Sequence, residues 1–151
     1  NEELGTLFVQ SNPIIAIQEN IITLEKKAND WQNIDNIKGK EIGTVRGYLY
    51  HDDADFIRID FTSERDLIRA LYKNRVDAAI SGDLPALYWA KKLNTPIAFA
   101  AIHSKGHLVM RLRKEHVALL PRINAAIAEL ELNGTTQSII DKYTMQDIFN
   151  R

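Results

Sequence analysis

The chain contains no cysteine and has few glycines and prolines. Of its 151 residues, 7 are Gly and 4 are Pro. The absence of cysteine excludes thiol catalysis, disulfides and cysteine-based zinc sites, but it fits a reducing and an oxidising compartment equally well. No apolar run approaches the roughly 18 residues of a membrane helix. The first residues, Asn1-Glu-Glu-Leu4, lack the pattern of a signal peptide, so we expect any export signal to lie outside this sequence.

An excess of positive charge is also lacking. The formal net charge is -1, and the composition is 45% hydrophobic and 26% charged. Because phosphate binding requires a basic face, this balance argues against nucleic acid as a partner. The local basic group of Arg111, Arg113 and Lys114 is typical of a solvated surface. The length and composition predict a globular chain with a core of useful size.

Apolar periodicity predicts alternating strands and helices, and therefore an α/β fold with a largely parallel sheet. A helical turn is expected at 34–37 and a tight turn at 104–106. The predicted strands span residues 14–24, 41–45, 56–61, 76–80, 97–102 and 108–112. The predicted helices span residues 64–73, 84–93, 117–132 and 137–143.

Two strand-to-helix turns organise the middle of the chain. The segments Glu41–Tyr50 and Asn74–Asp83 each contain a short apolar run that breaks at Gly47 or Gly82. In an open α/β sheet, the carboxyl ends of parallel strands meet the amino ends of helices, where unpaired N–H groups attract anions. Ligands therefore bind at such turns.

Two interpretations stay open for the residues of these turns. In the Arg46-Gly47-Tyr48 turn, Gly47 either permits a tight bend or belongs to a set of N–H groups that hold a carboxylate. Asp83 follows a strand and precedes a helix, where Asp is a common N-cap. A carboxylate at that position could equally receive a ligand ammonium group.

The histidines and acids do not predict a metal site or a catalytic site. His51 and the acids between residues 52 and 55 lack the spacing of a calcium loop. His103 and His107 are separated by a predicted turn, so the helical context of a zinc pair is missing. No Gly-x-Ser-x-Gly elbow is present. We therefore expect no metal, no cofactor and no catalytic residues.

The order of several motifs resembles the type II periplasmic solute-binding proteins, and most closely family 3, which serves the uptake of polar amino acids. The resemblance spans about residues 7–143. It rests on the segments Ile37–Tyr48, Leu67–Asp83, Ile123–Leu130, Asn133–Thr135 and Ile140–Tyr143.

The resemblance implies a two-lobed fold in which the chain crosses between lobes at a hinge of two strands. Residues 1–14 would be the end of the first lobe and a hinge strand, residues 15–102 the second lobe, and residues 103–151 the return hinge and C-terminal helices of the first lobe. Most of the first lobe would precede this sequence. If that lobe is truly absent, the exposed face would favour a dimer or domain exchange.

The resemblance also implies a function without catalysis: an extracytoplasmic, periplasmic component that captures a small polar solute such as an amino acid and passes it to a membrane permease. Asp83 would receive the α-amino group, and the Arg46-Gly47-Tyr48 turn would bind the α-carboxylate through backbone N–H groups. The family's small hydroxyl residues after this glycine are replaced by Tyr48 and Leu49. Alternatives are the sensing domain of a signalling receptor, an enzyme such as a cyclohexadienyl dehydratase with Asp83 or His51 as acid or base, and a copy that binds no ligand.

Overall fold

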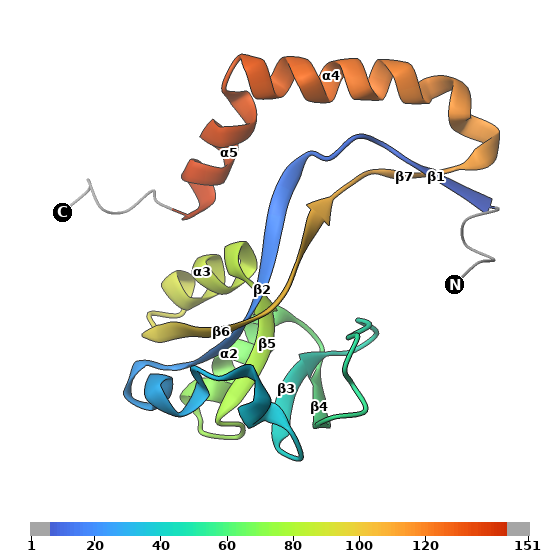
Figure 1. The fold of residues 1–151 in the computed structure, drawn as a ribbon. Coiled ribbons are helices and arrows are strands. Elements are labelled where there is room, and N and C mark those ends of the chain that lie inside the picture. The colour runs from blue at the N-terminus through green and yellow to red at the C-terminus, as the bar shows by residue number, and fades with distance from the viewer. Residues whose placement is uncertain (1–6, 145–151) are drawn as a thin grey trace. The chain divides into compact units, whose positions relative to one another are not determined.

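Two units make up the part of the chain that the computed structural model describes, residues 7–144 (Figure 1). The larger unit is Gln18–Lys105, and the smaller one combines the segments before and after it. β2 (Ile15–Leu24) and β6 (Ile97–Leu108) each run from one unit into the other. None of the helices in the described range has the length and apolar character that crossing a membrane requires.

A five-stranded mixed sheet forms the centre of the larger unit. Its order is β4-β3-β5-β2-β6, in which β3 is Glu41–Val45, β4 is Ile57–Phe61 and β5 is Ala78–Gly82. β3 runs parallel to both β4 and β5, whereas β2 runs antiparallel to β5. The predicted α/β class is confirmed, with a sheet that combines parallel and antiparallel pairs.

The two faces of this sheet bury different side chains because successive residues of a strand point to opposite faces. On one face, Ile22 and Ala79 pack with the apolar side of α2 (Glu64–Tyr72) and with α3 (Asp83–Lys92). On the other, Ile21 and Ile80 pack with Trp31 and Ile37. These last two residues belong to the 3₁₀ segments η1 (Glu25–Trp31) and η2 (Ile34–Ile37).

Gly43 allows β3 and β5 to pack closely. It lies opposite Ala79 in the parallel register, and a Cβ atom at this position would come within 2.9 Å of the Ala79 Cβ. Leu67 and Val76 would lie at 3.2 Å from the added atom. The glycine therefore fixes the spacing of the strands that carry the two candidate turns.

The smaller unit contains a short antiparallel pair of strands and the C-terminal helices. β1 (Phe8–Gln10) pairs with β7 (Arg111–Arg113). The chain then continues through η3 (Lys114–Leu119), α4 (Leu120–Leu132) and α5 (Thr135–Thr144). Gly134 separates the two α-helices with a φ of 78°, so the helix stop predicted at this position is confirmed.

Most predicted elements are present, and three predictions are wrong in detail. The strand expected at 76–80 is Ala78–Gly82, so Gly82 ends the strand instead of following it. The turn expected at 104–106 does not form, because β6 continues to Leu108, whose carbonyl accepts a hydrogen bond from the Ile14 amide at 2.9 Å. The strand expected at 108–112 is consequently reduced to β7. Between the strands expected at 14–24 and 41–45, the structure also contains η1, which periodicity did not predict.

Candidate functional site

The two turns singled out in the sequence lie at one edge of the sheet. Arg46 follows the last residue of β3, and Asp83 follows the last residue of β5. β3 and β5 are parallel neighbours, and Gly43 lies opposite Ala79. In the same register, Arg46 lies about opposite Gly82, because each is three residues further along its own chain segment. The carboxyl ends of both strands thus face the same side of the larger unit, as the parallel arrangement predicted.

Backbone geometry limits what the Arg46-Gly47-Tyr48 turn offers to an anion. Gly47 has a φ of 83°, a value that side chains disfavour. The Arg46 amide donates to the Phe61 carbonyl at 2.8 Å, and the Tyr48 amide donates to the Val45 carbonyl at 3.1 Å. Between residues 7 and 144, the Gly47 amide has no hydrogen-bond acceptor. One N–H group of the three is therefore available to a ligand.

The side chains of this turn point to other groups at the protein surface. The Tyr48 hydroxyl donates to Glu64 Oε1 at 2.9 Å, and this hydrogen bond, with burial, raises the pKa of Tyr48. Arg46 is exposed and lines a pocket of about 380 Å³ beside α2, together with Asp66 and Arg69. The lining mixes both signs of charge, so it does not define one class of ligand.

Asp83 is the first residue of α3 and not its N-cap. Gly82 occupies the N-cap position with a φ of -60° and a ψ of 145°, and no side chain caps the helix. Asp83 Oδ1 accepts the Leu84 amide at 2.9 Å. The interpretation of Asp83 as the N-cap is therefore wrong by one residue. Its carboxylate remains in the first turn, where the helix dipole stabilises negative charge.

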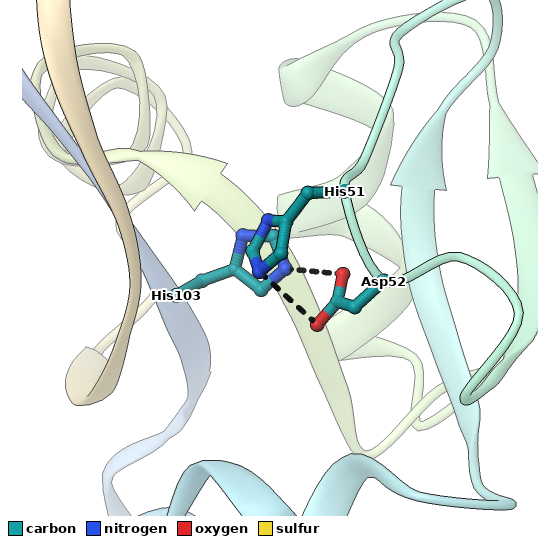
Figure 2. A group of neighbouring side chains, drawn as sticks. All are labelled: His51, Asp52 and His103. Carbon is teal, nitrogen blue, oxygen red and sulfur yellow. Dashed lines mark hydrogen bonds and ion pairs between the residues drawn. The ribbon is translucent and has the colours of Figure 1, made fainter.

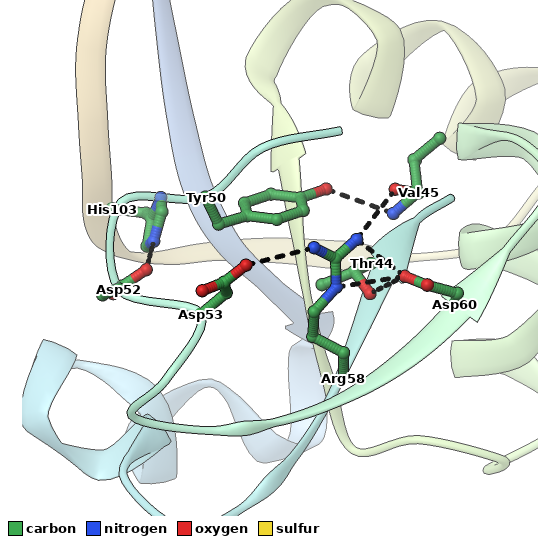
Figure 3. Close-up of polar contacts among 8 residues, drawn as sticks. All are labelled: Thr44, Val45, Tyr50, Asp52, Asp53, Arg58, Asp60 and His103. Atoms are coloured by element: carbon green, nitrogen blue, oxygen red, sulfur yellow. Dashed lines mark hydrogen bonds and ion pairs between the residues drawn. The ribbon is translucent and has the colours of Figure 1, made fainter. Parts of the chain in front are cut away.

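A polar network fixes the end of β3 just before the turn (Figure 3). The Tyr50 hydroxyl accepts the Val45 amide at 3.1 Å, and burial raises the pKa of Tyr50 to about 12. Asp60 Oδ1 accepts the Thr44 hydroxyl at 2.6 Å and Arg58 Nη2 at 2.9 Å. The Thr44 hydroxyl, followed by the Arg58 guanidinium, lowers the pKa of Asp60.

A second group of side chains, His51, Asp52 and His103, was not predicted from the sequence (Figure 2). His103 Nε2 lies 2.7 Å from Asp52 Oδ1, and His51 Nε2 lies 3.9 Å from Asp52 Oδ2. The two imidazole rings are 4.7 Å apart. His103 and Asp52 are separated by 51 positions, so no local spacing could have indicated the group.

Glu19 contacts this group from β2. Its Oε2 lies 3.5 Å from His103 Nδ1 and accepts the Ser104 hydroxyl at 2.6 Å. Burial lowers the pKa of His103, but the contacts with Glu19 and Asp52 more than offset it, so that this pKa is raised overall. Contact with His103 lowers the pKa of Glu19 against the opposing effect of burial.

His103 and His107 do not form a pair, although the reason differs from the one predicted. The residues between them are part of β6 instead of a turn. In a strand, residues four apart share a face, but at a rise of about 3.3 Å per residue they lie roughly 13 Å apart. Two side chains at that spacing cannot bind one metal ion.

Sequence comparison links the chain to amino-acid-binding proteins. No family model matches it. It is 31% identical over 140 residues to the L-cystine-binding protein TcyJ of Escherichia coli, a match covering 85% of this chain and 51% of that protein. It is 22% identical over 137 residues to the probable amino-acid-binding protein YxeM of Bacillus subtilis, with 84% and 52% covered. The chain thus spans about half the length of these relatives.

Structure comparison gives the same fold. The amino acid ABC transporter substrate-binding protein AbpA from Streptococcus pneumoniae, solved bound to L-arginine, matches with a TM-score of 0.81. The match covers 95% of this chain and 64% of that one, at 17% identity. These findings confirm the predicted resemblance: in sequence the chain is similar to amino-acid-binding proteins, and in fold to the substrate-binding protein of an amino acid ABC transporter.

Proposed function

We propose that the complete protein is the extracytoplasmic solute-binding component of an ABC-type uptake system, and that it binds an amino acid without chemically changing it. The 31% identity to the L-cystine-binding protein carries this proposal. L-Cystine and other polar amino acids are therefore the first ligands to test. A membrane permease would be the partner that receives the ligand.

In this proposal, Gln18–Lys105 is the second lobe of a two-lobed receptor. β2 and β6, which run between the two units, are its hinge strands. Closure around a ligand would then be a hinge motion, favoured because the ligand contacts both lobes only in the closed state. The smaller unit would belong to the first lobe.

The ligand would bind at the edge of the sheet where β3 and β5 end. Among the described residues the Gly47 amide has no hydrogen-bond acceptor, so it could donate to an α-carboxylate. The first turn of α3 would bring the Asp83 carboxylate near the end of the neighbouring strand. Arg46 and Tyr48 would flank the carboxylate. A single turn amide binds an anion weakly, so the first lobe would supply further donors, such as an arginine that forms two parallel hydrogen bonds.

The sensor and enzyme alternatives use the same fold and are not favoured by a specific contact. Both matched relatives carry the names of binding proteins. General acid or base catalysis would require a titratable group within hydrogen-bond reach of the reacting atom. In the described range, the hydrogen bond of the Asp83 carboxylate is with the Leu84 amide and not with a titratable partner.

Thermal unfolding of the full-length gene product with a panel of amino acids tests the proposal. A ligand at about 100 times its dissociation constant stabilises the folded state by roughly 2.7 kcal/mol. We expect at least one polar amino acid to raise the melting temperature. No shift with any member of the panel would contradict an amino-acid ligand.

The role of Asp83 is tested by the affinity of the variant Asp83→Asn for the best ligand of that panel. Losing a hydrogen bond between charged groups costs about 1.5–3 kcal/mol, so we expect affinity to fall roughly 10- to 100-fold. Asp55→Asn removes the same charge from an exposed loop position and serves as the matched control. Equal affinities of the two variants would exclude Asp83 as the ammonium partner.

A further inference from the structure

We propose that His51, Asp52 and His103 form a binding site for a divalent transition-metal ion of the Zn²⁺ class, with Glu19 as the outer partner of His103. All four residues belong to the larger unit. The proposal is independent of the amino-acid ligand. It replaces the prediction of no metal site made from the sequence, in which nothing indicated that His51 and His103, far apart in the chain, lie together.

The spacing of the donor atoms suits a small ion. One donor atom from each of the three residues lies within 4.8 Å of the others. Tetrahedral zinc binds nitrogen and oxygen at about 2.0–2.2 Å, which places two ligands roughly 3.4 Å apart. The contacts of Asp52 with His103 and His51, 2.7 Å and 3.9 Å, lie on either side of that value. Small side-chain rotations would make room for the ion.

Burial divides the site into a fixed part and a movable part. The His103 side chain is 0% exposed and that of Asp52 is 15% exposed, whereas that of His51 is 64% exposed. The buried His103 imidazole packs against the Tyr50 ring, with 6.0 Å between the ring centroids, whereas the exposed His51 imidazole can rotate toward the ion. We therefore expect an ion to approach from the solvent side, where His51 lies.

Glu19 lies close to where the outer carboxylate of a metal-binding histidine is usually found. A histidine that binds a metal through one nitrogen commonly donates its other N–H to a carboxylate, which fixes the tautomer. His103 Nε2 faces Asp52, and the buried Nδ1 lies 3.5 Å from Glu19 Oε2. Within residues 7–144, this Nδ1 is a buried nitrogen without a hydrogen bond. The Ser104 hydroxyl donates to the same oxygen of Glu19, Oε2, at 2.6 Å and so helps to fix this carboxylate.

The donor set selects the class of ion. Two imidazoles and one carboxylate suit Zn²⁺, Ni²⁺ and Cu²⁺, whereas Mg²⁺ and Ca²⁺ prefer oxygen ligands alone. The site has three protein ligands, which leaves a fourth position for water. We therefore expect Zn²⁺ to bind far more tightly than Mg²⁺.

Calorimetric titration of the metal-free 151-residue chain with ZnCl₂ tests the site. We expect one Zn²⁺ ion to bind per chain. The affinity for Zn²⁺ should be at least about tenfold weaker in the variants His51→Ala and Asp52→Asn. Glu19→Gln removes the outer carboxylate and should weaken binding about 10- to 100-fold. The sequence has 4 histidines, so His107→Ala and His116→Ala are matched controls that should bind as the parent does.

¹⁵N NMR spectra of the imidazole nitrogens give a second readout, and this measurement requires no variant of the buried His103. Zn²⁺ should shift the signals of His51 and His103 and leave those of His107 and His116 in place. Any of three results would overturn the proposal: binding only at millimolar Zn²⁺, shifts centred on His107 or His116, or affinity unchanged in both His51→Ala and Asp52→Asn.

Discussion

Hydrogen bonds of single side chains hold the end of β3 in the geometry that the adjoining turn requires. Thr44 is fully buried, and its hydroxyl donates to Asp60, which also receives the Arg58 guanidinium. The neighbouring Tyr50 hydroxyl accepts the Val45 amide. Gly47, with its positive φ, follows two residues after Val45. These bonds define the path of the chain before the turn, so the direction of the Gly47 N–H group depends on residues that no ligand would touch.

The Asp60 carboxylate should make stability depend on pH in the acid range. Its pKa is lowered from 3.8 by Thr44 and Arg58, so the folded state favours the charged form. The resulting stabilisation is present above pH 3.8 and is lost as the pH falls through the lowered pKa. At pH 7, we expect Asp60→Asn to lower the free energy of unfolding by less than about 1 kcal/mol, because the pair is exposed to water.

Urea unfolding at a series of pH values measures this effect. The free energies of unfolding of the parent and Asp60→Asn should differ at neutral pH and converge as the pH falls below 3.8 and through the lowered pKa of Asp60. Asp30→Asn removes an acid from an exposed position of η1 and should leave the difference near zero throughout. A gap between parent and Asp60→Asn that stays constant with pH would show that the carboxylate charge is not the cause.

Sequence reasoning at the residue scale succeeded where a role depends on neighbours in the chain. The turn glycine Gly47 is an example, because a break after an apolar run indicates a turn directly. Asp83 was placed one position wrong because β5 ends at Gly82, a boundary that depends on pairing with β2 and not on local pattern. The contact of His103 with Asp52 was not predictable, since only the fold brings β6 and the loop after β3 together.

At the scale of elements, α2 is the helix whose signals are most complete in the sequence. Ser63 is its N-cap and accepts the Asp66 amide at 3.3 Å. Glu64 and Asp66 occupy the first turn, and Leu67 and Leu71 are buried on one face. The N-cap residue, the acids in the first turn and the apolar face all indicate the same helix, which is why its start was predicted correctly.

The cap of α2 should contribute measurably to stability. We expect Ser63→Ala to lower the free energy of unfolding by about 1 kcal/mol, the usual cost of losing an N-cap side chain. Ser138→Ala, at an exposed interior position of α5, is the matched control. Because alanine has the higher helix propensity, that control should be neutral or slightly stabilising. Equal losses in the two variants, measured by chemical denaturation, would argue against a capping role.

The β6 strand shows why element boundaries were harder to predict than element types. Ser104, Lys105 and Gly106 have the composition of a turn, yet the structure extends the strand to Leu108. The Ser104 hydroxyl bonds to Glu19 on β2, and the Ile14 amide bonds to the Leu108 carbonyl. Pairing with distant residues outweighs the local preference for a turn. Such pairing cannot be read from the segment itself.

At the scale of the whole chain, buried apolar side chains are divided unequally between the two units. The buried apolar residues of the described range lie in Gln18–Lys105, with the exception of Ile127 in α4. Large apolar side chains of the smaller unit are exposed, including Leu132 at 89% and Tyr143 at 53%. Because burial of apolar surface is the main source of stability, the smaller unit should open locally before the larger one unfolds.

Native-state hydrogen exchange followed by mass spectrometry tests this difference. Amides of α2 and β5, which pack in the core, should exchange only with global unfolding. Those of α4 and α5 should exchange faster, on the order of tenfold or more, and should gain little protection from conditions that stabilise the core. Measuring the exchange rates at several pH values shows whether they report the equilibrium between closed and locally open states. Equal protection across α2, α4 and α5 would mean that the chain opens as one cooperative body, and the inference from burial would then be wrong.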